Sequence, residues 1–353
     1  MARCRVPQGP RSAGRPPSLR RAGAVLTSLS AVVATTVVAG PVAAAGADGP
    51  CTLRRTGAHH SEGLDSWDTR YPRPTRALDA VMVFLAFPDA RPRLTPRAVA
   101  ADHVPGTTAF FRRASYGRFR LRVHPVNRWI AMPRASSSYA IRRDWDTGHR
   151  AAYLRDALAA ADPAVDFRAY DIVYLVADPD APGVDPDATK VVNFDQPPRA
   201  DGTALRRLVT VFERHPPDRH VLAHETGHVL DLPDLYHRPE DGGGDWDTHV
   251  GDWDLMGSQF GLAPEPFGGD WDLMGSQFGL APEPFGWHKW KLGWLTGRQV
   301  ACVRATGGTR HTLRPLSAPM AADGARPGPV RSRRPGSVRA AAARAGGPGG
   351  GAA

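Results

Sequence analysis

Two histidines and a glutamate form the pattern in this sequence with the clearest chemical meaning. They lie in residues 221–236, which read VLAHETGHVLDLPDLY. His224 and His228 are four residues apart, and on a helix this spacing places both imidazoles on one face, where they can bind one metal ion. Glu225 projects toward the same site and can accept a proton from metal-bound water. Two neutral imidazoles and a carboxylate with an open fourth position suit zinc, so the segment predicts a catalytic zinc site.

A chance match to this motif is the alternative interpretation, because the chain contains 13 histidines. The context argues against it. The residues before His224 are apolar, no proline interrupts residues 221–232, and the chain begins with an export signal. We therefore expect a metal-binding helix here.

The third metal ligand must come from beyond this helix. Asp234 lies ten residues after His224, and this spacing matches the H-E-x-x-H-x-x-G-x-x-H/D layout of metzincin-like proteases. Asp231 occupies the glycine position of that layout, and aspartate tolerates a left-handed backbone better than most residues. Asp234 is the expected ligand. The alternatives are Asp231, His237 and His249.

Several apolar segments can build the fold that positions this helix. Apolar runs of strand length and one alternating segment predict strands, and two segments with helical features predict helices. Strands that alternate with helices indicate an α/β or α+β domain with a mixed sheet. The expected strands are 80–87, 119–123, 171–176 and 208–212, and the expected helices are 107–114 and 149–161.

Several linked motifs resemble one family. HETGHVLDLPDLY, followed by GDWDLMG and WHKWKLGWL, resembles the immune inhibitor A family of secreted zinc metallopeptidases, and FFRRASYGRFRL and YDIVYLV are similar to its upstream segments. The resemblance covers most of residues 78–296. The helix motif alone also resembles snapalysin, a small secreted neutral protease, but this leaves WDLM and KLGWL unexplained.

The family resemblance implies a fold and an activity. The fold is α+β, a zincin-type (metzincin-like) catalytic domain with a mixed twisted sheet and an HExxH active-site helix. His224, His228 and Asp234 would bind one zinc ion, and Glu225 would act as general base and acid. The expected function is a zinc-dependent endopeptidase that hydrolyses protein or peptide substrates. The alternative is a secreted zinc-binding pseudo-peptidase that has lost catalysis.

An exact tandem duplication follows the helix motif. Residues 251–268 read GDWDLMGSQFGLAPEPFG, and residues 269–286 repeat them without a change. Two identical copies indicate a recent duplication or an artefact of the sequence rather than an architecture, because structural repeats normally diverge and need about three copies. The resemblance implies that WDLM supplies a methionine turn beneath the metal, whereas ordinary core packing is the alternative. Met256 and Met274 are the candidates, and only one can lie there.

The first 47 residues have the order of a secretory signal peptide. Arg20 and Arg21 precede an uncharged run over residues 22–40, and small residues follow. A membrane anchor is the alternative, but the run is rich in Ala, Thr and Ser, ends at Pro41 and lacks a basic stop-transfer cluster. We expect a secreted, extracellular protein without a membrane anchor after cleavage, exported by the Sec or the twin-arginine route.

Two cysteines remain after cleavage of this signal. Cys51 and Cys302 lie near the two ends of the segment that can fold, and in an exported chain they predict one long-range disulfide. Two free thiols are the alternative. Cys51 as a zinc ligand in a latent form is a weaker alternative.

The remaining segments complete the domain organisation. Residues 48–77 form an irregular N-terminal segment or a propeptide remnant, and residues 78–318 form the peptidase domain. Residues 319–353 consist mainly of Ala, Gly, Pro and Arg and are expected to be disordered. Their abrupt change of composition suggests an altered reading frame.

The net charge of +10 does not indicate a nucleic-acid partner. Six arginines and no acid precede residue 48, and six arginines and one acid follow residue 318, which leaves −1 for residues 48–318. A nearly neutral core lacks the basic surface that binds phosphates. No nucleic-acid partner is therefore expected.

Two acidic clusters raise the question of calcium. Neither cluster has EF-hand spacing, so solvated loops are favoured over a Ca²⁺ site. The clusters are Asp178, Asp180, Asp185 and Asp187, and Asp241, Asp245, Asp247, Asp252 and Asp254.

Overall fold

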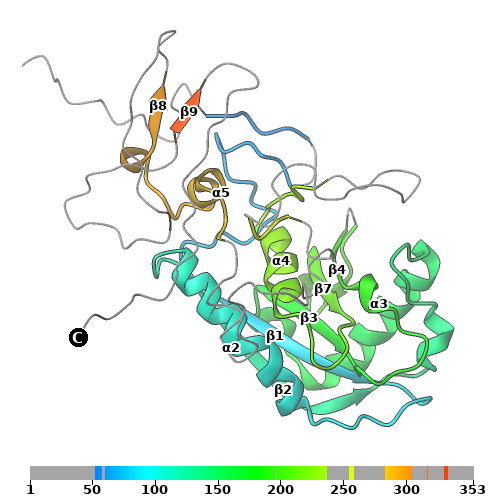
Figure 1. Ribbon diagram of the computed structural model, residues 1–353. Coiled ribbons are helices and arrows are strands. Elements are labelled where there is room, and N and C mark those ends of the chain that lie inside the picture. Colours follow the sequence, from blue (N-terminus) through cyan, green and yellow to red (C-terminus); the bar gives the residue numbers. More distant parts are fainter. Residues whose placement is uncertain are drawn as a thin grey trace, which may run out of the picture. The chain divides into compact units, whose positions relative to one another are not determined.

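A mixed five-stranded β-sheet is the framework of the described structure (Figure 1). The computed structural model describes residues 52–57, 60–194, 196–236, 254–257, 283–303, 316 and 330–332. The strands of this sheet are β1 (Ala77–Ala86), β2 (Arg120–Ala131), β3 (Ile172–Ala177), β4 (Lys190–Asn193) and β7 (Arg207–Val211). Their order is β2-β1-β3-β7-β4, with β4 antiparallel at one edge and the other strands parallel.

The central strands are continuous apolar runs. Most residues of β1 and all residues of β3 and β7 are buried. This is typical of parallel strands that are covered on both faces. The strands predicted at 80–87, 171–176 and 208–212 are confirmed.

Strand β2 extends beyond the predicted residues 119–123. It continues to Ala131 along β1, with a shift in register between Met82 and Phe84. The added residues 124–131 do not alternate strictly, because polar His124, Asn127 and Arg128 are exposed and lie among partly buried apolar residues of this edge strand. Hydrophobic alternation alone therefore underestimated its length.

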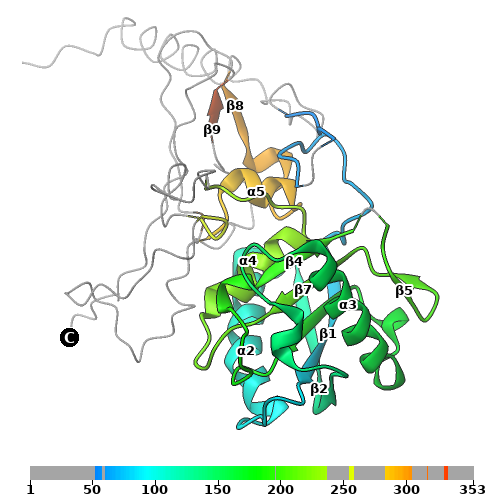
Figure 2. The same cartoon turned by 90° about the vertical axis from the view of Figure 1, so that its right-hand side faces the viewer.

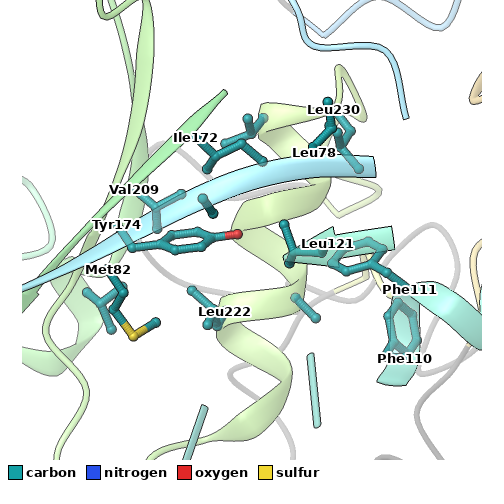
Figure 3. Packing of buried hydrophobic residues seen from close by; sticks show 14 of the residues in the cluster. Leu78, Met82, Phe110, Phe111, Leu121, Ile172, Tyr174, Val209, Leu222 and Leu230 are labelled. Atoms are coloured by element: carbon teal, nitrogen blue, oxygen red, sulfur yellow. The ribbon is translucent and has the colours of Figure 1, made fainter. Parts of the chain in front are cut away.

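Helices cover both faces of the sheet (Figure 2). They are α2 (Pro96–Ala114), α3 (Thr147–Ala161) and α4 (Arg219–Val229). On one face, Leu78 and Met82 of β1 pack with residues of α2 and α4, as Figure 3 shows. On the other face, Val81 and Val83 pack with residues of α3. Successive side chains of β1 point to opposite faces of the sheet and so belong to two separate layers of the core.

Each of these helices begins at a side-chain cap. The side chains of Thr95, Asp146 and Asp218 accept hydrogen bonds from the first turns of α2, α3 and α4. Helix α3 confirms the prediction at 149–161. Helix α2 begins eleven residues before the predicted 107–114 and continues through Pro105. The observed structure is α+β, and it agrees with the predicted mixed sheet.

Shorter elements complete the described chain. They are η1 (Ser136–Tyr139), η2 (Asp162–Ala164), η3 (Phe167–Ala169), η4 (Pro186–Ala188), β5 (Arg199–Ala200), β6 (Thr203–Ala204), α5 (Gly286–Lys291), η7 (Gly297–Gln299), β8 (Ala301–Val303) and β9 (Val330–Ser332). Strand β9 pairs in parallel with β8, and the rest of residues 319–353 lies outside the described residues.

Two sequence predictions concern residues of which the structure says little. Residues 1–47 lie outside the described residues, so the signal peptide stays a prediction. The same holds for the disulfide, because neither Cys51 nor the side chain of Cys302 is described. No helix among the described residues is long and apolar enough to cross a membrane.

Candidate metal centre

Helix α4 carries a buried group that can hold a metal ion. His224, Glu225 and His228 are all buried, and one ligand atom of each lies within 4.8 Å of the others. Among the described residues this is the only such group of three or more His, Cys, Asp or Glu side chains. Leu222 and Ala223 anchor the helix in the hydrophobic core, and Leu222 is visible in Figure 3. The predicted helix is therefore present and brings the three side chains together.

Backbone carbonyls orient both imidazoles. The Nδ1 atom of His224 lies 2.9 Å from the carbonyl oxygen of Leu255, and Nδ1 of His228 lies 2.7 Å from that of Leu232. A carbonyl oxygen can only accept, so each Nδ1 donates its hydrogen, and in the neutral imidazole Nε2 then carries the lone pair that can bind a metal ion. Such contacts fix the tautomer of metal-binding histidines.

Asp234 meets both imidazoles at these Nε2 atoms. Its Oδ1 lies 3.2 Å from Nε2 of His224 and 3.1 Å from Nε2 of His228. Ligand atoms at 2.0–2.1 Å from a tetrahedral zinc ion are about 3.3 Å apart, and the two distances from Asp234 to the imidazoles are close to this value. Asp234, the third ligand expected from the sequence, thus lies beside both imidazoles.

The electrostatics of these groups favour a cation between them. Burial alone would raise the pKa of Asp234, but His228 and His224 hold this pKa far below its usual value. Burial alone would lower the pKa of His228, but the Asp234 carboxylate raises it to about 9. A positive charge is thus stabilised between the two imidazoles and the Asp234 carboxylate, so a proton and a metal ion would compete for the same ligand atoms.

The buried carboxyl group of Glu225 belongs to the same site. Burial raises the pKa of its carboxyl, although the neighbouring His228 and His224 oppose this shift. Its Oε2 accepts a hydrogen bond of 2.5 Å from the backbone N–H of Val191 in β4. Glu225 therefore connects the metal group to the edge of the sheet.

The chain returns to the site through a left-handed turn at Asp231. Its φ is 72°, and the N–H groups of Asp231 and Leu232 donate to the carbonyls of His228 and Gly227 at 3.0 Å. These two bonds form a Schellman motif, which usually has glycine at the left-handed position. The predicted left-handed turn is confirmed. The Asp231 carboxylate contacts Arg55 and Lys291, whereas His237 and His249 lie outside the described residues.

Met256 lies against helix α4. A Cβ added to Gly227 would lie 2.6 Å from Sδ of Met256, so only glycine allows this approach. The N–H of Leu235 donates to the carbonyl of Met256 at 2.8 Å, which ties the two segments together. Met256 of the first copy thus lies beside α4, whereas Trp253 and Met274 lie outside the described residues.

Two other neighbours of the site were not predicted as part of it. Tyr236 stacks on His224 with ring centroids 6.3 Å apart, and His60 lies 5.1 Å from the ring of His228. The Nε2 atom of His60 is 3.2 Å from Nδ2 of Asn193 at the end of β4. His60 belongs to a polar, irregular segment, so no pattern could indicate its position.

The acidic clusters do not join into a second group of this kind in the described part of the chain. Asp178, Asp180, Asp185 and Asp187 are described, yet three-ligand groups are absent there apart from the one on α4. Within the other cluster only Asp254 is described.

Comparison with models of protein families found no match, and comparison with curated proteins also found none. The fold and the site define an α+β protein with a buried, HExxH-like group that can hold a metal ion.

Proposed function

We propose that this protein is a secreted zinc-dependent endopeptidase of the zincin type, similar to the immune inhibitor A family. One observation carries the proposal. Oδ1 of Asp234 lies 3.2 Å from Nε2 of His224 and 3.1 Å from Nε2 of His228, and Glu225 forms one buried group with the two histidines. Two imidazoles and one carboxylate are a donor set of catalytic zinc sites.

Different residues of this chain have different roles in the proposed peptide hydrolysis. His224, His228 and Asp234 would hold the metal ion, which when bound would lower the pKa of water and polarise the scissile carbonyl. Glu225 takes the proton of the attacking water on its carboxylate and returns it to the leaving amine. Burial raises the pKa of Glu225 toward the working pH, which suits a group that both accepts and donates a proton.

Strand β4 offers a place for an extended peptide. Phe194 donates its N–H to Arg206 on the β7 side, so by alternation the N–H groups of Val191 and Asn193 point away from β7. The N–H of Val191 already meets Glu225. A substrate strand that pairs with this edge would place its scissile bond beside the metal group, and main-chain hydrogen bonds would bind it.

The test is Glu225→Gln in the purified protein, with zinc content and hydrolysis of an unstructured protein such as casein as readouts. We expect one zinc ion per chain to remain and hydrolysis to fall about 10²–10⁴-fold, as for loss of a general base. Glu213→Gln is the matched control, because Glu213 lies outside the metal group.

Substantial activity in Glu225→Gln would refute its role as a base. Bound zinc without turnover in the unchanged protein would favour the alternative, a zinc-binding module that has lost catalysis.

A further inference from the structure

The left-handed turn at Asp231 is stabilised by residues that are distant in the sequence. Asp231 is fully buried, and its Oδ2 lies 2.5 Å from Nη1 of Arg55 and 3.2 Å from Nζ of Lys291. Lys291 also donates to the carbonyls of Asp231 and Ser61. A buried carboxylate needs such partners, and a non-glycine residue at positive φ needs surroundings that hold it there.

Arg55 forms a fork between two carboxylates. Nη1 binds Asp231, and Nη2 lies 3.5 Å from Oδ2 of Asp68. Its backbone N–H donates to Asp65 at 2.8 Å. A Cβ on Gly63 would lie 2.2 Å from Cα of Arg55, so the segment folds back tightly on itself. Arg55 is therefore held in place from both sides.

A second chain of contacts leads from the same segment to His224. Oε1 of Glu62 lies 2.9 Å from Nε2 of His288, and Nδ1 of His288 lies 3.7 Å from Oδ2 of Asp254. Burial would lower the pKa of His288, but Glu62 and Asp254 raise it to about 10, so it is a buried cation. Asp254 in turn accepts the N–H of Met256 at 2.8 Å, beside the Leu255 carbonyl that orients His224.

We propose that residues 52–57 and 60–68 are a permanent part of the metal centre rather than a removable pro-segment, and that Arg55 and Glu62 are positioning residues. Arg55 holds the Asp231 turn that returns the chain to Asp234. Glu62 holds His288 against Asp254 and so fixes the turn that orients His224. The inference rests on the proposed metal site, but it does not require catalytic activity.

The test measures zinc affinity of the full chain by competition with a chromophoric chelator. Arg55→Ala should weaken zinc binding about 10–100-fold, the usual effect of losing a residue that orients metal ligands. Arg54→Ala is the matched control, because Arg54 is exposed and adjacent, and its affinity should stay within about twofold of the unchanged protein. Arg55→Lys keeps the charge but not the fork, so it should restore part of the affinity.

A variant pair keeps the test decisive if Arg55→Ala folds poorly. Arg55→Ala leaves the Asp231 carboxylate short of a partner, and adding Asp231→Gly removes that carboxylate and supplies the residue that the turn favours. The double variant should therefore fold and bind zinc better than Arg55→Ala. Equal defects in the two variants would overturn the proposal.

The N-terminus of the mature protein gives a second readout. Mass spectrometry of the secreted, zinc-loaded protein should show a chain that begins before Arg55. A mature chain that begins after Asp68 and binds zinc with full affinity would overturn the inference, as would unchanged affinity in folded Arg55→Ala. All affinities are measured in the Glu225→Gln background, which does not depend on activity. Tight zinc binding without hydrolysis in the protein with Glu225 unchanged would refute the proposed function and leave this inference standing.

Discussion

The sheet with α4 and the segments around the C-terminal end of α4 are stabilised in different ways. Leu222 and Ala223 fix the helix in a core with β1, β3 and α2, where nearly all contacts are apolar. Around the other end, where Leu230 and Met256 continue this core, residues 52–57, residues 60–68 and α5 also meet the turns at Asp231 and Asp254 through ion pairs. Apolar packing thus places the HExxH helix, and ion pairs additionally fix the turns beside the candidate metal group.

The difference matters because the two kinds of contact respond differently to change. Apolar contacts are non-directional and roughly proportional to the area buried. A buried ion pair adds little net stability, but removal of one partner leaves an uncompensated charge. We therefore expect variants of the sheet to change stability alone, and variants of the ion pairs to change stability and metal binding together.

The largest expected effect is that of Asp254→Ala. It leaves the His288 cation with Glu62 only and removes the acceptor of two backbone N–H groups, those of Met256 and Phe285. The free energy of unfolding should fall by about 3–5 kcal/mol. Zinc affinity of the folded protein should also fall, because the Leu255 carbonyl loses its support. Denaturant unfolding and chelator competition measure the two quantities.

Leu78→Ala is the comparison from the sheet. Leu78 is fully buried in the core, and its truncation should cost about 2–5 kcal/mol. Zinc affinity of the folded protein should not change. Asp187→Ala, at an exposed ion pair, should change neither quantity. Equal losses of zinc affinity in Leu78→Ala and Asp254→Ala would break the distinction between the two regions.

The same distinction explains what the sequence could predict. Local patterns predicted the central strands, α3 and the helix with the His-Glu-His group, because apolar runs, helical spacing and the i, i+4 histidines are visible within a few residues. The turn at Asp231 was also predictable from its position after the helix.

The contacts that hold this turn were not predictable. Arg55 pairs with Asp231 over 176 positions, and Lys291 donates to it over 60. Nothing in the irregular segment 48–77 distinguishes Arg55 from the other arginines nearby, because ion pairs leave no periodic pattern in the sequence. The position of His60 was not predictable either, because its ring contact with His228 forms only in the folded chain and leaves no pattern in the sequence.

The duplicated segment gives a second comparison, between its two copies. Met256 of the first copy is fully buried against Gly227, and the end of the second copy continues directly into α5. Met256→Ala should therefore lower the free energy of unfolding by about 2–3 kcal/mol, and Met274→Ala should change it by less than about 0.5 kcal/mol. Thermal or denaturant unfolding of both variants measures this. The reverse result would place the second copy beside α4.

The smallest expected effect follows from removal of one copy. Deletion of residues 251–268 or of residues 269–286 yields the same sequence, because the copies are identical. The N–H of Phe285 donates to Asp254 at 2.5 Å, and in the shortened chain the phenylalanine of the remaining copy can make the same bond. Every contact of the metal centre described above is thus available to the shorter protein.

Only the connection between Gly257 and Glu283 changes in this deletion, from 25 residues to 7. If that connection only closes a loop, its shortening reduces the entropy cost of closure and should stabilise the protein by about 1 kcal/mol. Zinc affinity and hydrolysis should stay the same. Loss of zinc affinity would mean that the second copy contributes contacts to the metal centre, and the duplication would then belong with the segments that orient the site rather than with a tolerated insertion.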